Sequence, residues 1–213
     1  MPNDPANPSD LERRPIAARS SGWARFLAAR LANSSVTPNQ ISVLSIAFAA
    51  LGGMAMVAGG VWWSWIVAAL CVQLRLVCNL LDGMVAIEGG KSSPVGALYN
   101  EFPDRISDSL LLVPMGYAAD CPWLGWLAAL LAALTAYVRV FGGALGQNQE
   151  FSGIMAKQRR MAALTVGLLA QTVEGFAFDT RYSLLVAAVV IAAGSLVTCI
   201  SRTRGIARRL AAP

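Results

Sequence analysis

RLVCNLLDGMVAIEGGKSSPVGALYNEFPDRISD, residues 75–108, is the stretch on which the interpretation of this chain depends. It lies between apolar runs long enough to cross a membrane, yet it carries several polar side chains: Asn79, Asp82, Asn100, Asp104, Arg105 and Asp108. Ionisable groups at membrane depth cost free energy, and they persist mainly where they face a polar cavity. The stretch therefore predicts a functional site inside a membrane protein.

Two helical segments are predicted within this stretch, joined by residues 88–94. On the first segment, Asn79 and Asp82 are three residues apart and therefore share a helix face. On the second, every fourth residue falls on one stripe: Gly96, Asn100, Asp104 and Asp108. Two facing helices that present oxygen ligands beside small residues suit a hard divalent cation and a phosphate-bearing substrate.

This spacing resembles the motif of the CDP-alcohol phosphotransferase family, Asp-x2-Asp-Gly-x2-Ala-Arg-x8-Gly-x3-Asp-x3-Asp, which spans the second and third membrane helices. Five of the eight motif residues are present at the same spacings: Asp82, Gly83, Ala86, Gly96 and Asp104. The chain departs from the motif at Asn79, Ile87 and Asn100. Because a spaced motif across two helices rarely arises by chance, the chain is identified as a divergent member of the family.

The resemblance implies a transferase of phospholipid biosynthesis. Such an enzyme moves a phosphatidyl group from a CDP-linked lipid, such as CDP-diacylglycerol, to a small alcohol or a lipid alcohol, and CMP leaves. By the same resemblance Asp82 and Asp104 are the catalytic residues, and Asp104 helps to deprotonate the acceptor hydroxyl. The ligands expected for Mg²⁺ or Mn²⁺ are Asn79, Asp82, Asn100, Asp104 and Asp108. The residues expected to contact the nucleotide are Gly83, Ala86 and Gly96, and a homodimer is expected.

Asn79 and Asn100 stand where the family has metal-binding aspartates. An asparagine offers one neutral carbonyl oxygen in nearly the same place, so the geometry is kept while the site loses two negative charges. We therefore expect one divalent ion rather than two, or a second ion that binds only with the substrate pyrophosphate. Asp108 is either a further ligand or a helix-surface acid paired with Arg105.

Several basic residues are expected on the same side of the membrane as this site. Arg139 and Lys157 are candidates for binding a phosphate of the acceptor or of the lipid. Arg75, one turn before Asn79, is a third candidate, or it neutralises the acidic cluster. Arg160 is expected to be an anchor at the membrane surface, as cations at the ends of membrane helices often are.

The composition indicates an all-α integral membrane protein, because the 213 residues have a mean hydropathy of +0.55 and only 14% are charged. Six apolar spans of about the length needed to cross hydrocarbon are predicted at 41–58, 61–87, 95–118, 123–146, 161–178 and 183–200. Thr37-Pro38-Asn39 is typical of a helix start. The expected division is a flexible tail (1–12), a basic amphipathic interfacial segment (13–38), a six-helix domain (39–201) and a basic cytoplasmic tail (202–213).

The interfacial segment carries five arginines together with Trp23, Phe26, Leu27 and Leu31 at helical spacing. Further basic residues gather in the Lys91 loop, in residues 147–160 and at the carboxyl end, whereas the other connections hold one arginine. The positive-inside rule therefore places both termini and the site towards the cytoplasm, in the inner membrane. The net charge of +5 suits the anionic surface of the lipid bilayer, and no nucleic-acid motif is present.

Other chemistries find little support in the sequence. There is no histidine, so histidine acid–base chemistry and histidine metal sites are excluded, and the four cysteines lack the spacing of metal ligands or disulfides. Two alternatives remain: a non-catalytic relative that binds nucleotide or lipid as a scaffold, favoured by the two asparagines, and a small transporter. Against transport, the acids cluster near one face. The acceptor alcohol stays open.

Overall fold

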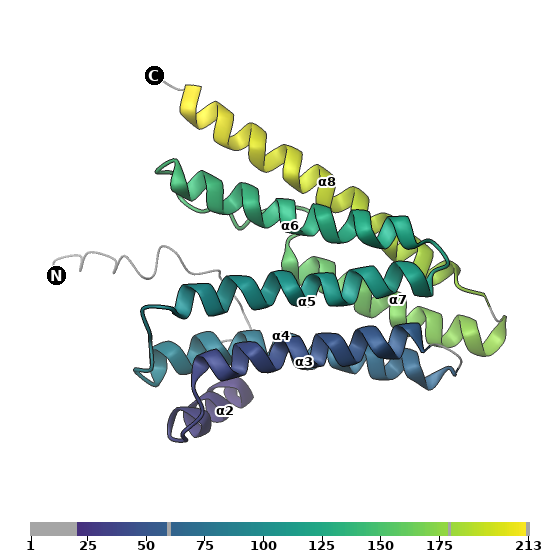
Figure 1. Cartoon of the computed structure of the whole chain (residues 1–213), viewed down its shortest axis with the longest axis horizontal. Coiled ribbons are helices and arrows are strands. Elements are labelled where there is room, and N and C mark those ends of the chain that lie inside the picture. Colours follow the sequence, from purple (N-terminus) through teal and green to yellow (C-terminus); the bar gives the residue numbers. More distant parts are fainter. Residues whose placement is uncertain (1–20, 59–60, 179, 212–213) are drawn as a thin grey trace.

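The structure, a computed structural model, describes residues 21–58, 61–178 and 180–211, and its regular elements in these ranges are helices (Figure 1). They are α2 (Gly22–Ala32), α3 (Pro38–Val57), α4 (Trp63–Glu88), α5 (Gly96–Ala118), α6 (Pro122–Ala144), α7 (Lys157–Ala177) and α8 (Tyr182–Ala211). The tail predicted for residues 1–12 and the first part of the predicted interfacial segment lie outside the described residues.

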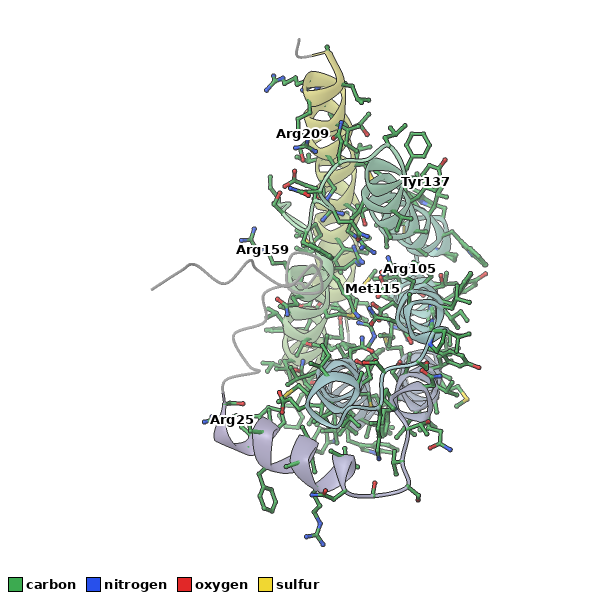
Figure 2. The ribbon with its side chains drawn as sticks, turned by 90° about the vertical axis from the view of Figure 1, so that its left-hand side faces the viewer. Arg25, Arg105, Met115, Tyr137, Arg159 and Arg209 are labelled. Carbon is green, nitrogen blue, oxygen red and sulfur yellow. The ribbon has the colours of Figure 1, made fainter. Side chains whose placement is uncertain are left out.

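The six long helices close a ring of pairwise packing. α3 packs against α4 and α5, α5 against α6, α6 against α8, α8 against α7, and α7 against α4. α4 and α5 are neighbours in sequence but make little direct contact, because α3 packs against both of them. Figure 2 looks nearly along the bundle and shows α2 running crosswise along its lower edge, beside α4, with Arg25 directed away from the other helices.

The predicted helix start at Thr37-Pro38-Asn39 is confirmed. The Thr37 hydroxyl accepts a hydrogen bond from the Gln40 backbone N–H at 3.3 Å, and the Gln40 side chain accepts one from the Thr37 backbone N–H at 2.9 Å. Pro38 occupies the first helical position, where its missing N–H costs nothing. This reciprocal cap fixes where α3 begins, and with it the register of the polar residues in its first turns.

Four of the helices, α3, α4, α6 and α8, are long and apolar enough to cross a membrane by length and composition. α5 and α7 have 23 and 21 residues, but charged side chains interrupt their apolar character. α8 is longer than the predicted span, because most of the segment expected as a basic tail continues the helix to Ala211. Arg202, in that continuation, is buried and donates hydrogen bonds to the carbonyl oxygens of Thr135 and Ser152.

α2 packs against α4 through its small residues. Ala24 and Ala28 are buried there, and Leu27 and Leu31 are partly buried against the same cluster. Trp23 and Phe26, which the sequence places at helical spacing with these leucines, point outward and are exposed. The Lys91 ammonium donates to the carbonyl oxygens of Leu31, Ser34 and Val36, and so ties the loop after α4 to the end of α2.

Close packing of α3 on α5 depends on Gly53, because a Cβ added there would lie 2.3 Å from the Leu110 carbonyl oxygen. Gly53→Ala is expected to lower the free energy of unfolding by about 1–3 kcal/mol, although alanine favours a helix over glycine. Thermal unfolding in detergent, followed by circular dichroism, measures this. Gly22→Ala is the matched control, since nothing lies within 4 Å of the added Cβ. A Gly53→Ala protein as stable as the wild type would contradict this account of the contact.

Candidate functional site

The polar residues of the motif gather near one end of the bundle. They come from the second half of α4 and the first half of α5, which lie towards the end where α2 and the last turns of α8 are found (Figure 1, left), and side chains from the first turns of α3 and α7 join them. α4 and α5 barely touch through their backbones, so long side chains from both helices meet in the space between them. The ring arrangement therefore leaves room for a polar interior at this end.

Asp104 is the centre of the site. Its Oδ1 accepts a hydrogen bond from Asn79 Nδ2 at 2.8 Å, so the structure brings together motif residues from α4 and α5. The same oxygen is contacted by the Lys157 ammonium from α7 and lies 3.5 Å from Arg75 Nη2. Its other oxygen, Oδ2, has a longer contact of 3.6 Å with Arg105. Asp104 thus has one oxygen crowded by N–H donors and one oxygen with a single, longer contact.

Asp82 is held by a residue that sequence reasoning missed. Ser42 Oγ, near the start of α3, donates a hydrogen bond to Asp82 Oδ2 at 2.7 Å, and both side chains are buried. Asp82 Oδ1 accepts the Gly83 backbone N–H at 2.6 Å. The one signal in the sequence is a serine within an apolar span, four residues after Pro38, which does not reveal that it faces α4.

Asp108 is buried between two arginines, which corrects one of the two interpretations given above. Its Oδ1 lies 2.8 Å from Arg75 Nη2 and its Oδ2 lies 2.6 Å from Arg160 Nη2. It is therefore not a helix-surface acid, and the acid nearest to Arg105 is Asp104. Figure 2 shows Arg105 on α5 towards the middle of the bundle.

Arg160 is not a surface anchor either, because its exposed fraction is 1%. Lys157 and Arg160 are three residues apart on α7 and so share the helix face that points towards α5. Arg159, between them, points outward and is exposed (Figure 2). Of the three basic residues in this cluster, Lys157 and Arg160 are therefore buried and only Arg159 is exposed.

Arg139 and Asn100 stand apart from these contacts. Arg139, on α6, lies 2.5 Å from Glu101 Oε1, donates to Gln149 Oε1 and lies 5.0 Å from the Phe151 ring centroid. Asn100 is exposed on α5, one turn before Asp104, and within the described ranges no hydrogen bond joins it to the other motif residues. The candidate phosphate-binding residues therefore divide into Arg75 and Lys157 at the acids, and Arg139 beside the neighbouring turn of α5.

The candidate nucleotide-contacting residues flank the acids. Gly83 and Ala86 lie half-buried on α4, one turn apart, and the Ala86 carbonyl oxygen accepts a hydrogen bond from Ser92 Oγ at 3.0 Å. Gly96 begins α5, where an added Cβ would meet only Ser93 Oγ, at 3.5 Å. Among the described residues, the backbone at Gly96 is therefore open to close approach apart from the Ser93 hydroxyl, which is the property expected of a surface that contacts a nucleotide.

The donor set fits one divalent ion better than two. Asp82, Asn79 and Asp104 offer oxygen ligands of the kind that Mg²⁺ and Mn²⁺ take. Among the described residues, however, no three acidic, cysteine or histidine side chains are grouped as metal ligands. Asp104 Oδ1 is already surrounded by N–H donors, so the oxygens that can accept a cation are those of Asp82, the Asn79 carbonyl and Asp104 Oδ2.

Cations outnumber carboxylates around this site: Arg75, Arg105, Lys157 and Arg160 face Asp82, Asp104 and Asp108. Within the described chain, Arg75 Nε and Nη1 and Arg160 Nε are buried without a hydrogen-bond partner. Guanidinium N–H groups bind phosphate oxygens in charge-assisted hydrogen bonds. The site therefore combines oxygen ligands for a cation with spare donors for an anion, as a phosphate ester bound with a metal requires.

Fold and site together define a helical membrane protein with an acidic and amide-lined polar site near one end of its bundle. The family model for CDP-alcohol phosphatidyltransferase matches residues 35–200. The chain belongs to this family, whose members are membrane transferases, and this confirms the resemblance drawn from the motif.

Named relatives agree with this membership. The chain is 24% identical over 192 residues to a phosphatidylinositol phosphate synthase of Mycolicibacterium smegmatis, covering 86% of this chain and 83% of that protein. It is 32% identical over 143 residues to a bifunctional IPC transferase and DIPP synthase of Rubrobacter xylanophilus, covering 64% of this chain. The match spans only about a third, 32%, of that longer protein.

The fold agrees with a solved structure. The phosphatidylinositol phosphate synthase of Mycobacterium tuberculosis with CDP-DAG bound superimposes with a TM-score of 0.73 at 20% sequence identity, covering 87% of this chain and 94% of that one. The same enzyme has also been solved in complex with manganese and citrate, with a TM-score of 0.71 and a similar coverage. At this identity the likeness establishes the fold.

Proposed function

We propose that this chain transfers a phosphatidyl group from a CDP-linked lipid, such as CDP-diacylglycerol, to an alcohol and releases CMP. The observation that carries the proposal is the meeting of Asn79, Asp82 and Asp104 in one site with Ser42 and Lys157, within a chain of this family. The relatives named as phosphatidylinositol phosphate synthases, one of them solved with CDP-DAG, support the same donor.

The chemistry falls to Asp104 and its neighbours. Asp104 Oδ2, the less crowded oxygen, takes the proton of the acceptor hydroxyl. The hydroxyl oxygen then forms a bond to the phosphorus that carries the lipid, and the bond from that phosphorus to CMP breaks. Arg75, whose Nε and Nη1 are buried without partners, donates to phosphate oxygens during this step.

A divalent ion, Mg²⁺ or Mn²⁺, would be held by Asp82, the Asn79 carbonyl oxygen and Asp104 Oδ2. When bound, it would neutralise charge on the pyrophosphate and on the leaving CMP. The manganese complex of the Mycobacterium tuberculosis enzyme supports this choice of ion. Asp108 is held by Arg75 and Arg160, so we propose for it a role in positioning Arg75 rather than in binding metal.

We also propose that α5 and α7 cross the membrane with the four apolar helices. Their buried charges, Asp104, Asp108, Lys157 and Arg160, face one another across the interior, so the outer faces of both helices remain available to lipid. The polar site and the basic connections lie at the same end of the bundle, and the positive-inside rule supports a cytoplasmic location for this end. We further propose that the chain forms a homodimer. The acceptor in this proposal is a water-soluble alcohol or a lipid alcohol.

The direct test is CMP release from CDP-diacylglycerol by the purified protein in detergent, with pooled alcohols and with Mg²⁺ or EDTA. Release that requires the metal and disappears in Asp82→Ala supports the transferase, and dividing the pool identifies the acceptor. If no condition gives CMP although the protein binds CDP-diacylglycerol, the transferase proposal is wrong.

A second candidate, a non-catalytic relative that binds nucleotide or lipid, is favoured by one particular observation. Two of the four acids that the family motif carries are asparagines here, and one of the remaining two, Asp104, is in contact with the ammonium of Lys157. Binding of CDP-diacylglycerol without CMP release under any condition is the result that this candidate predicts.

Ser42→Ala tests whether Ser42 positions Asp82. The variant removes the 2.7 Å hydrogen bond and leaves a buried carboxylate oxygen without its donor. A hydrogen bond to a charged group contributes about 1.5–3 kcal/mol, so CMP release is expected to fall about 10- to 100-fold. Ser45→Ala is the matched control, because Ser45 is equally buried on α3 but donates to the Ser42 backbone carbonyl oxygen. An equal loss in both variants would show a general effect of α3 packing instead.

A further inference from the structure

Lys157 is a buried ammonium whose closest charged partner is a motif carboxylate. It lies at the first position of α7, is 8% exposed, and contacts Asp104 Oδ1. Burying a lysine costs free energy unless it is paired, and the partner here is an acid that the family motif assigns to the metal-binding site. The contact crosses 53 residues of sequence and joins α7 to α5.

The surroundings of Asp104 Oδ1 leave little space for a metal ion. This oxygen accepts hydrogen bonds from Asn79 Nδ2 and from Lys157, and Arg75 Nη2 lies 3.5 Å away. A metal ion on this oxygen would have to displace these donors. It would also lie beside two positive charges, and their repulsion would lower its binding affinity. Asp82, in contrast, has one hydroxyl and one backbone N–H as its hydrogen-bond partners.

The charges in the site agree with this division. Asn79 and Asn100 remove two negative charges from the motif, and the ammonium of Lys157 adds a fixed positive charge next to one of the two acids that remain. A pair of divalent ions would bring four positive charges to Asp82 and Asp104, and Asp104 already faces two buried cations, Arg75 and Lys157. One divalent ion beside the fixed ammonium of Lys157 gives a much smaller excess of positive charge than two divalent ions would give.

We propose that Lys157 is a built-in cation that replaces one metal ion at Asp104, so that the site holds a single exchangeable divalent ion, centred on Asp82. This inference rests on the proposed function, because it concerns the same site. Lys157 and the replacements at positions 79 and 100 then form one adaptation: the acids that would hold a second ion are absent, and a side chain supplies positive charge in its place.

The test is Mn²⁺ binding to the purified full chain in detergent without nucleotide, measured by electron paramagnetic resonance of free Mn²⁺ and by calorimetry. The wild type is expected to bind one ion per chain. Lys157→Met is expected to bind Mn²⁺ at least about tenfold more tightly, because a positive charge beside the site is lost. Lys157→Arg, which keeps the charge, should stay within about twofold of the wild type. Arg159→Met, which removes an exposed charge two positions along α7, should do the same.

A pair of variants tests the number of ions. Asn79→Asp places a second carboxylate against Asp104, and with Lys157 present it should still bind one ion. The double variant Asn79→Asp, Lys157→Met should bind two. The proposal would be overturned if the wild type or Asn79→Asp alone bound two ions, or if the wild type bound none. It would also be overturned if Lys157→Met and Arg159→Met bound Mn²⁺ with the same affinity.

If Lys157→Met does not fold, the ion counts of the wild type and of Asn79→Asp still decide the question. The result of this metal-binding test is also independent of the result of the CMP-release test. Metal-dependent CMP release by a protein that binds two ions would contradict only the role of Lys157. One bound Mn²⁺ without any CMP release would contradict only the transferase.

Discussion

Asp104→Asn is expected to lower metal-dependent CMP release by about 100- to 10,000-fold, the range typical for loss of a general base. The change keeps the shape of the side chain but removes the charge that accepts the acceptor's proton. The amide can still meet Asn79 and Lys157, so a folded protein is expected. Initial rates of CMP release at saturating CDP-diacylglycerol measure the effect.

Asp120→Asn is the matched control for this variant. Asp120 lies in the connection between α5 and α6, is exposed and has a φ of +54°, a conformation that asparagine adopts readily. The Asp120→Asn variant should therefore keep the rate of CMP release and the midpoint of thermal unfolding near those of the wild type. An Asp104→Asn rate within tenfold of the wild type would exclude Asp104 as the base.

Asp108→Ala is expected to lower the free energy of unfolding by about 3–5 kcal/mol. Removing one partner of a buried ion pair leaves an uncompensated charge: here Arg160 loses its acidic partner, and Arg75 keeps only its longer, 3.5 Å contact with Asp104. Both arginines are almost completely buried, so water cannot replace the lost carboxylate without opening the bundle. Thermal unfolding in detergent, with recovery of monodisperse protein as a second readout, measures the loss.

Arg209→Ala is the control for an exposed ion pair. Arg209 lies 3.0 Å from Glu150 near the end of α8, and both side chains are substantially exposed. Hydrogen bonds from Ser152 and Arg209 lower the pKa of Glu150, but an exposed pair of this kind contributes only about 0–1 kcal/mol. Equal losses in the two variants would mean that the Asp108 pairs contribute no more than a surface contact.

The sequence predicted the positions of the six long helices closely, because the length and apolar character of a segment are local properties. It was less successful where a helix carries charge. The last turns of α8 resemble a basic tail, yet they are helical and Arg202 points inward to carbonyl oxygens of other segments. Whether an arginine faces water or the interior depends on which helices pack beside it. The spacing of residues in the sequence does not specify these neighbours.

For the site, the sequence by itself determined which residue types lie on one face of α4 and α5, since helical periodicity and the family motif fix Asn79, Asp82 and Asp104. Only the tertiary structure decided which charges oppose them. Ser42, Lys157 and Arg160 reach the site from α3 and α7, across 40, 53 and 52 residues of sequence respectively. The ring of helices brings these side chains together because each helix packs on neighbours that are distant in sequence, and such pairings depend on the shapes of all six helices at once.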